Sequence, residues 1–334
     1  MKYFLGIDGG QSSTTALIGD ETGRIVGVGH AGPCNHATLA EGRERFTRAL
    51  TASVAEAVRQ SPALFGGDVS LQRKTADNST PDCDVALVTF ESACMGFSGG
   101  PADKDSLARE IVHAKQYFIT HDALIALAGA TAGEPGVVVI AGTGSMAFGR
   151  NAEGRTARAG GWGYAFGDEG SAYDIVRQAL RAALRFEEGW GPATQLRDAM
   201  LGTAGAIDAN DLLHQFYSPG YTRKRIAELA TLVDEVARCG DPIARDVLNQ
   251  AAQSLATIAS AVREQLFIPS HIVTIACVGG VFHSALLLER FRMLLELHDG
   301  NRVAAPRYGP AAGALLEAYR LAGLTITLSG APLD

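Results

Sequence analysis

Short apolar runs separated by polar turn residues fill the first 30 residues of the chain. The runs lie at residues 3–7, 14–18 and 25–29, and the turns between them lie at 8–13 and 21–24. Apolar runs of this length between turns rich in Gly, Ser and Thr are typical of β-strands joined by hairpins. The chain is therefore predicted to open with three short antiparallel strands.

The spacing of apolar residues changes at residues 39–60, where Phe46, Leu50, Val54 and Val58 recur every four positions. This spacing predicts a helix with one buried face, so the chain combines a mixed sheet with helices. The same criteria predict strands at 85–89, 117–120 and 272–278, helices at 105–114, 123–131, 172–184, 242–266, 284–297 and 310–321, and a surface loop at 61–82.

The second half of the chain repeats the pattern of the opening, although not its sequence. Residues 137–140 are an apolar, β-branched run that predicts a buried strand, and a glycine turn follows at 142–145. A second strand at 146–149, a polar turn at 151–154 and a third strand from Arg155 onward complete the echo. Two copies of one pattern indicate two similar α/β domains that face each other across a cleft.

Length and composition support this division. A chain of 334 residues exceeds one typical domain, so we expect an N-terminal domain at 1–118, joined by the helix at 310–322, and a C-terminal domain at 119–334 with helical additions. The net charge of -7 argues against nucleic acid or an anionic membrane as partner.

The N-terminal sequence and the cysteines indicate a cytoplasmic protein. No signal-peptide pattern precedes the first strand, and no apolar run reaches membrane-spanning length. The five cysteines are scattered without any CxxC spacing, so free thiols are expected rather than disulfides or a zinc site.

The turn that follows the first predicted strand carries groups suited to phosphate. Gly9 and Gly10 allow a close approach of the backbone, Ser12 and Ser13 can donate hydroxyl hydrogens, and Asp8 could hold a magnesium ion through water. An ordinary tight hairpin with a capping aspartate is the alternative interpretation.

The turn at 142–145 follows the strand at 137–140 and offers free backbone N–H groups together with the hydroxyls of Thr143 and Ser145. Such a turn suits phosphate or the hydroxyls of a polar ligand, and an ordinary hairpin turn is the alternative. Asp122 follows another predicted strand and opens a helix. It can be a helix N-cap, a carboxylate that accepts a proton from a substrate hydroxyl, or both.

The glycine-rich segment at 160–171 contains Trp162 between glycines, which suits an exposed platform for a sugar ring better than a core position. Asp168 in the same segment can accept two hydrogen bonds from neighbouring hydroxyls, or it caps the helix that follows, with Ser171 three residues on. Gly279 and Gly280 follow a buried strand and could admit a nucleotide base or ribose, or form a helix-entry turn.

Other nucleotide and hydrolase motifs are excluded. The GxGxxG match at 27–32 is followed by Pro33 and opens no helix, so it is not a dinucleotide fingerprint. The chain contains neither a GxxxxGK[ST] phosphate loop nor a GxSxG nucleophile elbow.

Taken together, these segments resemble the N-acetylglucosamine kinase family of the actin-like superfamily of sugar kinases and chaperone ATPases, which the benzoyl-CoA reductase activator-type ATPases share. The resemblance covers nearly the whole chain in order. Residues 8–14 and 141–145 are similar to the two phosphate loops, 33–36 to the sugar-binding Asn-His segment, and 277–281 to the adenosine motif. Residues 160–173 are the most specific match. Residues 98–100, 120–123 and 309–313 match as well.

The resemblance implies two ribonuclease H-like domains of the actin-like ATPase type, with ATP and Mg²⁺ as cofactors. It implies that Asp122 is the catalytic base and that Asp8 holds the metal. Implied sugar-binding residues are Asn35, Thr143, Gly144, Ser145, Gly161, Trp162, Gly163 and Asp168. Implied nucleotide-binding residues are Gly9, Gly10, Ser12, Ser13, Thr143, Gly279, Gly280 and Ser284.

The function expected from the resemblance is ATP-dependent phosphorylation of N-acetylglucosamine on its 6-hydroxyl. Glucosamine or another hexose is an open alternative, because Met146 departs from the family pattern beside the sugar. An ATPase activator of a reductase or dehydratase is a second alternative, although the cysteines form no convincing iron–sulfur set. A sugar-sensing regulator is a third, although such proteins often carry a DNA-binding helical domain and none is expected before Tyr3. A homodimer is left open.

Overall fold

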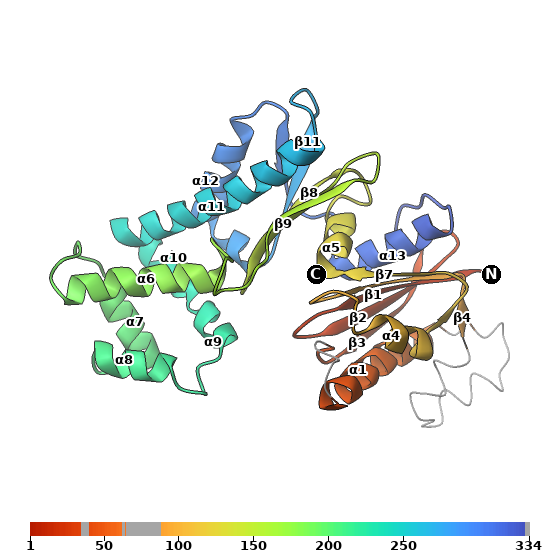
Figure 1. Cartoon of the computed structure of the whole chain (residues 1–334), viewed down its shortest axis with the longest axis horizontal. Helices are drawn as coiled ribbons and strands as arrows, with labels where there is room; N and C mark the ends of the chain where they lie inside the picture. The colour runs from red at the N-terminus through yellow and green to blue at the C-terminus, as the bar shows by residue number, and fades with distance from the viewer. Residues whose placement is uncertain (35–39, 62–63, 65–87, 331–334) are drawn as a thin grey trace. The chain divides into compact units, whose positions relative to one another are not determined.

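The computed structural model describes residues 1–34, 40–61, 64 and 88–330. The chain divides into two compact units, the first made of residues 1–134 and 306–334 and the second of residues 135–305 (Figure 1). The division falls after residue 134, not after residue 118 as the sequence predicted, because the strand and helix that follow residue 116 pair and pack within the first unit.

The first unit is built on a five-stranded mixed sheet with the strand order β3-β2-β1-β5-β7. Its strands are β1 (Tyr3–Gly9), β2 (Thr14–Asp20), β3 (Ile25–Ala31), β5 (Ser92–Phe97) and β7 (Tyr117–His121). The first three are antiparallel, as the meander predicted, whereas β1, β5 and β7 run parallel to one another. A separate pair is formed by β4 (Thr89–Phe90) and β6 (His113–Ala114).

Helices cover both faces of this sheet. Its helices are α1 (Ala40–Arg59), α4 (Asp105–Ile111), α5 (Asp122–Ala130) and α13 (Pro310–Leu321). Along β1 the side chains alternate, so Leu5 and Ile7 join the core with α1 while Phe4 joins the core with α13. Gly6 lies directly under α13, where an added Cβ would lie 2.2 Å from the backbone nitrogen of Leu315.

The second unit repeats the same sheet. Its strands are β8 (Gly136–Ala141), β9 (Ser145–Arg150), β10 (Thr156–Gly160), β11 (Val273–Val278) and β12 (Asn301–Ala304), and their order is β10-β9-β8-β11-β12. Here too the first three strands are antiparallel and the last two join in parallel. The echo that the sequence shows in its turns therefore extends to strand order and strand direction.

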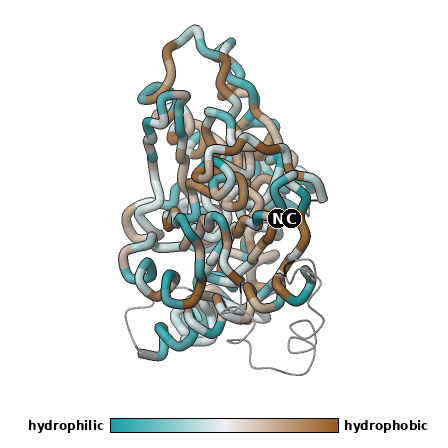
Figure 2. Tube along the Cα trace, turned by 90° about the vertical axis from the view of Figure 1, so that its right-hand side faces the viewer, coloured by the Kyte–Doolittle hydropathy of each residue, from teal (hydrophilic) through white to brown (hydrophobic). Residues whose placement is uncertain are grey.

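The longest helix of the second unit is α11 (Pro242–Leu266), which packs against several of the others. The others are α6 (Ala172–Glu187), α7 (Leu196–Ala204), α8 (Ala209–Phe216), α9 (Arg223–Glu228), α10 (Ala230–Arg238), the 3-10 turn η2 (Gly280–His283) and α12 (Ala285–Glu296). Apolar residues of α11 pack against β8, β9 and α6 in one buried cluster. Apolar and polar residues follow each other within the same elements, as the brown and teal segments of Figure 2 show.

Two strands depart from the prediction. The strand expected at 85–89 lies largely outside the described residues; Val88 is not in a strand, Thr89 begins the short strand β4, and the strand of the five-stranded sheet in this region is β5. Its sequence Ser-Ala-Cys-Met-Gly-Phe lacks β-branched residues, so its burial comes from its central place between β1 and β7. The short strand β12 carried no clear sequence signal. Within the described part of the chain, no helix combines the length and apolar character needed to cross a membrane.

Candidate functional site

Three chemically active segments meet at one edge of the first sheet. Because β1, β5 and β7 are parallel, their carboxyl ends lie at the same edge. The register pairs Gly9 with Phe97 and Phe97 with His121, so Gly10, Ser98 and Asp122 leave the sheet side by side. In open α/β sheets, ligands bind outside the carboxyl ends of the parallel strands.

The carboxylate of Asp122 is half-buried and held at both oxygens. Its Oδ2 accepts a hydrogen bond of 2.7 Å from the hydroxyl of Ser98, and its Oδ1 accepts one of 2.9 Å from the N–H of Ala123. Asp122 is the first residue of α5, and the N-cap is His121, whose Nδ1 accepts from the N–H of Leu124 at 3.3 Å. The N-cap interpretation of Asp122 is therefore wrong, and its carboxylate is available for other chemistry.

The turn after β1 is tied to its neighbours through backbone atoms. The N–H of Gly10 donates to the carbonyl of Ser13 at 2.8 Å, and the carbonyl of Gly10 accepts from the N–H of Cys34 at 3.2 Å. Ser12 and Ser13 are exposed, so both hydroxyls are accessible to a ligand. Gly10 does not have positive φ, and an added Cβ there would lie 3.1 Å from the carbonyl oxygen of Ser13, so a side chain would crowd the turn without straining its φ.

Gly9 has a packing role in addition to the predicted one. An added Cβ would lie 2.4 Å from the ring of Phe97 and 2.6 Å from Sγ of Cys34. Burial raises the pKa of the Cys34 thiol, which keeps it protonated behind the turn. Asn35, the predicted sugar ligand that follows Cys34, lies outside the described residues.

The carboxylate of Asp8 is chemically suited to bind magnesium. It is half-buried at the end of β1, directly before the turn at Gly9 and Gly10. Magnesium usually binds one or two carboxylates, phosphate oxygens and water, so a single acid at a phosphate-binding turn is a suitable protein contribution. Among the described residues, no group of three His, Cys, Asp or Glu side chains gathers as a metal cage.

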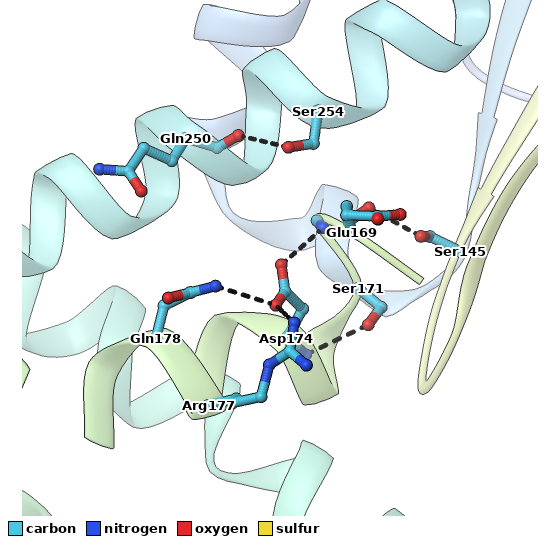
Figure 3. A network of polar contacts seen from close by, with 9 residues as sticks. Ser145, Glu169, Ser171, Asp174, Arg177, Gln178, Gln250 and Ser254 are labelled. Carbon is cyan, nitrogen blue, oxygen red and sulfur yellow. Dashed lines mark hydrogen bonds and ion pairs between the residues drawn. The ribbon is translucent and has the colours of Figure 1, made fainter. Parts of the chain in front are cut away.

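In the second unit, two loops interlock at the carboxyl end of β8. The hydroxyl of Ser145 donates to the carbonyl of Glu169 at 2.7 Å (Figure 3). The N–H of Ala172 donates to the carbonyl of Gly142 at 2.9 Å. Ser145 is buried and its hydroxyl hydrogen is used in this contact, so the structure assigns it a part in holding the two loops together.

Asp168 is buried in a strained conformation. Its φ of 61° is a left-handed value that few residues other than glycine adopt, and only 5% of its surface is exposed. Its carboxylate lies against Gly144, where an added Cβ would be 2.8 Å from Oδ2 of Asp168. The helix cap is Ser171, whose hydroxyl accepts from the N–H of Asp174 at 3.2 Å, so the cap interpretation of Asp168 is wrong.

The glycine-rich segment before Asp168 presents an exposed aromatic ring. Gly161 and Gly163 have positive φ, and Trp162 between them keeps 66% of its surface exposed. The guanidinium of Arg158 lies 4.4 Å from the centre of the Trp162 ring, which orients the ring by a cation–π contact. A sugar-stacking role for this ring stays a prediction.

A cavity of about 540 Å³ lies in the second unit beside these loops. It brings together predicted residues from distant segments, namely Thr143, Gly280 and Ser284. Gly279, the residue directly before Gly280, has a φ of 107°. An added Cβ on Gly279 would lie 2.4 Å from the carbonyl oxygen of Ala141. Glycine is therefore required where β11 ends and the cavity begins.

Sequence reasoning missed several polar residues of this cavity. Lys224, Asp234, Glu235 and Arg238 line it, and Asp234 accepts a hydrogen bond of 2.5 Å from Ser284. Asp234 also pairs with Arg238 four residues later on α10. That spacing is readable in the sequence, but it is common on exposed helices and carries no specific functional signal.

Comparison with known proteins identifies similar sequences over most of the chain. Residues 5–318 match the BadF/BadG/BcrA/BcrD ATPase family. A protein of Clostridium acetobutylicum named N-acetylmuramic acid/N-acetylglucosamine kinase is 32% identical over 89% of this chain and 92% of its own length. A protein of Dictyostelium discoideum named N-acetyl-D-glucosamine kinase is 33% identical over 79% of this chain and 80% of its own.

A solved structure is similar as well. It is a Chromobacterium violaceum protein assigned as an N-acetylglucosamine kinase, which is 24% identical and has a TM-score of 0.70, with 95% of this chain and 98% of that chain covered. At this identity the match supports the fold alone. The resemblance drawn from the sequence motifs is confirmed by the two sequence relatives.

Proposed function

The chain belongs to the BadF/BadG/BcrA/BcrD ATPase family, and we propose that it is a kinase that transfers a phosphoryl group from ATP to the 6-hydroxyl of N-acetylglucosamine. The observation that carries the proposal is the orientation of the Asp122 carboxylate by Ser98, at the sheet edge where the first phosphate loop also begins. Two relatives named as kinases of this sugar, each more than 30% identical over most of the chain, support it.

Asp122 is proposed to act as the general base. A carboxylate can orient the 6-hydroxyl and accept its proton as the oxygen attacks the γ-phosphorus. The two hydrogen bonds from Ser98 and Ala123 leave lone pairs on both carboxylate oxygens for the substrate. Phosphoryl transfer requires mainly positioning and charge stabilisation, which a fixed carboxylate provides.

The nucleotide is proposed to bind two sets of residues. Thr143, Gly280 and Ser284 line the 540 Å³ cavity, which suits an adenosine and the first phosphates. Gly9, Gly10, Ser12 and Ser13 offer backbone space and exposed hydroxyls to the terminal phosphates. Asp8 would hold Mg²⁺, which when bound neutralises charge on the phosphate oxygens.

The sugar is proposed to bind Asp168, the backbone of Gly144, and the segment of Gly161, Trp162 and Gly163. The position of Asp168 supports this role, because its carboxylate lies against Gly144 and can accept hydrogen bonds from the hydroxyls of a sugar. Asn35 remains a proposed ligand from the sequence.

The larger architecture and setting are also proposed. The identical strand order of the two sheets supports two ribonuclease H-like domains of an actin-like ATPase. Four further properties stay predictions: a cleft between the domains, a cytoplasmic location, the absence of nucleic-acid binding and a homodimer. Small-angle scattering can test the cleft, cell fractionation the location, and light scattering the homodimer.

An assay of ADP release over a sugar panel tests the function. The panel contains N-acetylglucosamine, glucosamine, N-acetylmuramic acid and glucose, each with ATP and Mg²⁺. N-acetylglucosamine is expected to give the highest kcat/KM, with glucosamine next. N-acetylmuramic acid is included because the name of the Clostridium relative contains it. ADP release with none of these sugars, and with an unrelated acceptor instead, would contradict the proposal.

A further inference from the structure

A buried carboxylate on α6 holds the turn that carries Asp168. Oδ2 of Asp174 accepts a hydrogen bond of 3.0 Å from the backbone N–H of Gly170. Oδ1 of the same group pairs with Arg177 at 2.6 Å and accepts from the side-chain amide of Gln178 at 3.2 Å (Figure 3). Asp174 is only 8% exposed and lines neither of the proposed ligand sites.

The turn from Asp168 to Ser171 is fixed on its other sides as well. Gly170 has a φ of 77°, and an added Cβ would lie 2.6 Å from the carbonyl oxygen of Ala251 on α11. Glu169 is held through its carbonyl by Ser145, and the N–H of Ser171 donates to the carbonyl of Asp168 at 3.1 Å. A strained residue persists only where its surroundings over-determine its conformation, and Asp168 meets that condition.

The side chain of Asp174 reaches this turn through the N–H of Gly170. Without Asp174 this N–H would be buried and unpaired, and such a group is unfavourable enough to shift a glycine-rich backbone. Arg177 and Gln178 orient the carboxylate from the next turn of α6, and the charge of Arg177 compensates that of Asp174. The network therefore fixes Gly170, and through it the φ of Asp168.

We propose that Asp174 is a positioning residue for the acceptor sugar, acting through Gly170 to keep the Asp168 carboxylate in its left-handed conformation against Gly144. This inference rests on the proposed function, in which Asp168 binds the sugar. Loss of the Asp174 contact weakens sugar binding while the nucleotide cavity, which Asp174 does not line, keeps its affinity for ATP.

The test compares Asp174→Ala with Asp174→Asn, because the asparagine keeps an acceptor for Gly170 and the alanine does not. Asp174→Ala is expected to raise the KM for N-acetylglucosamine at least tenfold, with the KM for ATP changed less than twofold. Asp174→Asn is expected to restore the sugar KM to within about threefold of the wild type.

Asp241→Asn is the matched control for a general loss of stability. Asp241 is a buried acid of the same unit that caps α11 by accepting from the N–H of Ala244, and it lines neither proposed site. Its variant is expected to melt at a lower temperature with an unchanged sugar KM. If Asp174→Ala fails to fold, Asp174→Glu serves instead, because it keeps the charge beside Arg177 and displaces the carboxylate from Gly170.

Amide hydrogen exchange separates this inference from the proposed function. The Gly170 amide is expected to exchange at least tenfold faster in Asp174→Ala than in the wild type, and at the wild-type rate in Asp241→Asn. A folded Asp174→Ala variant with normal sugar KM and normal Gly170 exchange overturns the inference. Wild-type protein that phosphorylates no sugar overturns the proposed function, and the exchange measurement still decides whether Asp174 holds the turn.

Discussion

The hydroxyl of Ser98 donates a hydrogen bond of 2.7 Å to Oδ2 of Asp122, although the two residues lie 24 positions apart in the sequence. The contact exists because β5 and β7 are parallel neighbours with a register that brings their carboxyl ends together. Oδ1 of Asp122 accepts from its own helix, at the N–H of Ala123. The carboxylate is thus oriented from two sides before any ligand binds.

Asp122→Asn is expected to fold normally and to lose turnover. The helix cap is His121, so α5 keeps its N-terminal hydrogen bond, and asparagine still accepts from Ser98. The amide cannot take a proton at neutral pH, and loss of a general base lowers kcat by a factor of about 100 to 10,000. Turnover and sugar affinity are measured on the same preparation. Near-normal turnover would assign Asp122 a structural role and move the search for the base to Asp168.

Ser98→Ala is expected to lower kcat about tenfold with little change in sugar KM, because one hydrogen bond to a charged group contributes about 1.5 kcal/mol. Ser98→Thr, which keeps the hydroxyl, is the matched control and is expected to retain most of the activity. Steady-state kinetics on both variants measure the effect. Equal losses in the two variants would show that the hydroxyl is not the relevant group.

Asp168→Gly is expected to stabilise the protein while abolishing sugar phosphorylation. Asp168 is buried with a φ of 61°, and glycine adopts this conformation without strain. The free energy of unfolding is expected to rise by about 1 kcal/mol. Urea unfolding tests the gain in stability, and the ADP-release assay tests the loss of sugar phosphorylation. Asp168→Asn, which tolerates the same φ, should leave stability nearly unchanged, and lower stability in the glycine variant would contradict the assignment of strain.

Gly279→Ala is expected to destabilise the second unit by about 2–3 kcal/mol, because its φ of 107° is strained for alanine and the new Cβ would meet the carbonyl oxygen of Ala141. Gly280→Ala is the adjacent control, since no atom lies within 4 Å of its added Cβ. Thermal unfolding and ATP titration compare the variants. Similar stabilities of the two would contradict the requirement for glycine at residue 279.

Asp20→Asn is expected to lower the free energy of unfolding at neutral pH by removing a contribution that the wild type loses in acid. Burial alone would raise the pKa of Asp20, but hydrogen bonds donated by Thr22 and Arg24 outweigh it and lower the pKa. A lowered folded pKa contributes stability above the unfolded value of about 3.9, and this contribution is lost as pH falls through the folded value. The variant should lose about 1–2 kcal/mol at pH 7.

Urea unfolding at pH 7 and pH 3 tests the direction of this pH dependence. The difference between wild type and Asp20→Asn should shrink at pH 3, because the aspartate takes up its proton more readily in the unfolded state, which favours unfolding of the wild type. Glu21→Gln on the same turn is the control, because Glu21 is exposed and its carboxylate accepts a hydrogen bond of 3.3 Å from the N–H of Lys2 at the surface. A difference that is equal at both pH values would contradict the linkage.

Most strands and the helices outside residues 196–238 could be predicted from the sequence because their periodicity is a local property, whereas α7, α8, α9 and α10 were not predicted. The helix from Pro242 to Leu266 shows its buried stripe directly, and the antiparallel strands of the two openings are set by short turns. The glycine turns after β1 and β8 and the segment around Trp162 could also be recognised, because their glycines and hydroxyl residues are clustered in the local sequence. These features identified the family, which the sequence relatives confirm.

The tertiary structure alone decided how these segments combine. β5 was missed because Ser-Ala-Cys-Met-Gly-Phe becomes a central strand only when β1 and β7 pair on either side of it. The partners of Asp122 and of Gly170 come from strand register and helix packing rather than from any local signal. The polar lining of the cavity, including Asp234, is assembled from α9, α10 and η2. A sequence pattern specifies which groups are present and which local structure carries them, whereas the approach of distant groups depends on long-range packing that no local period encodes.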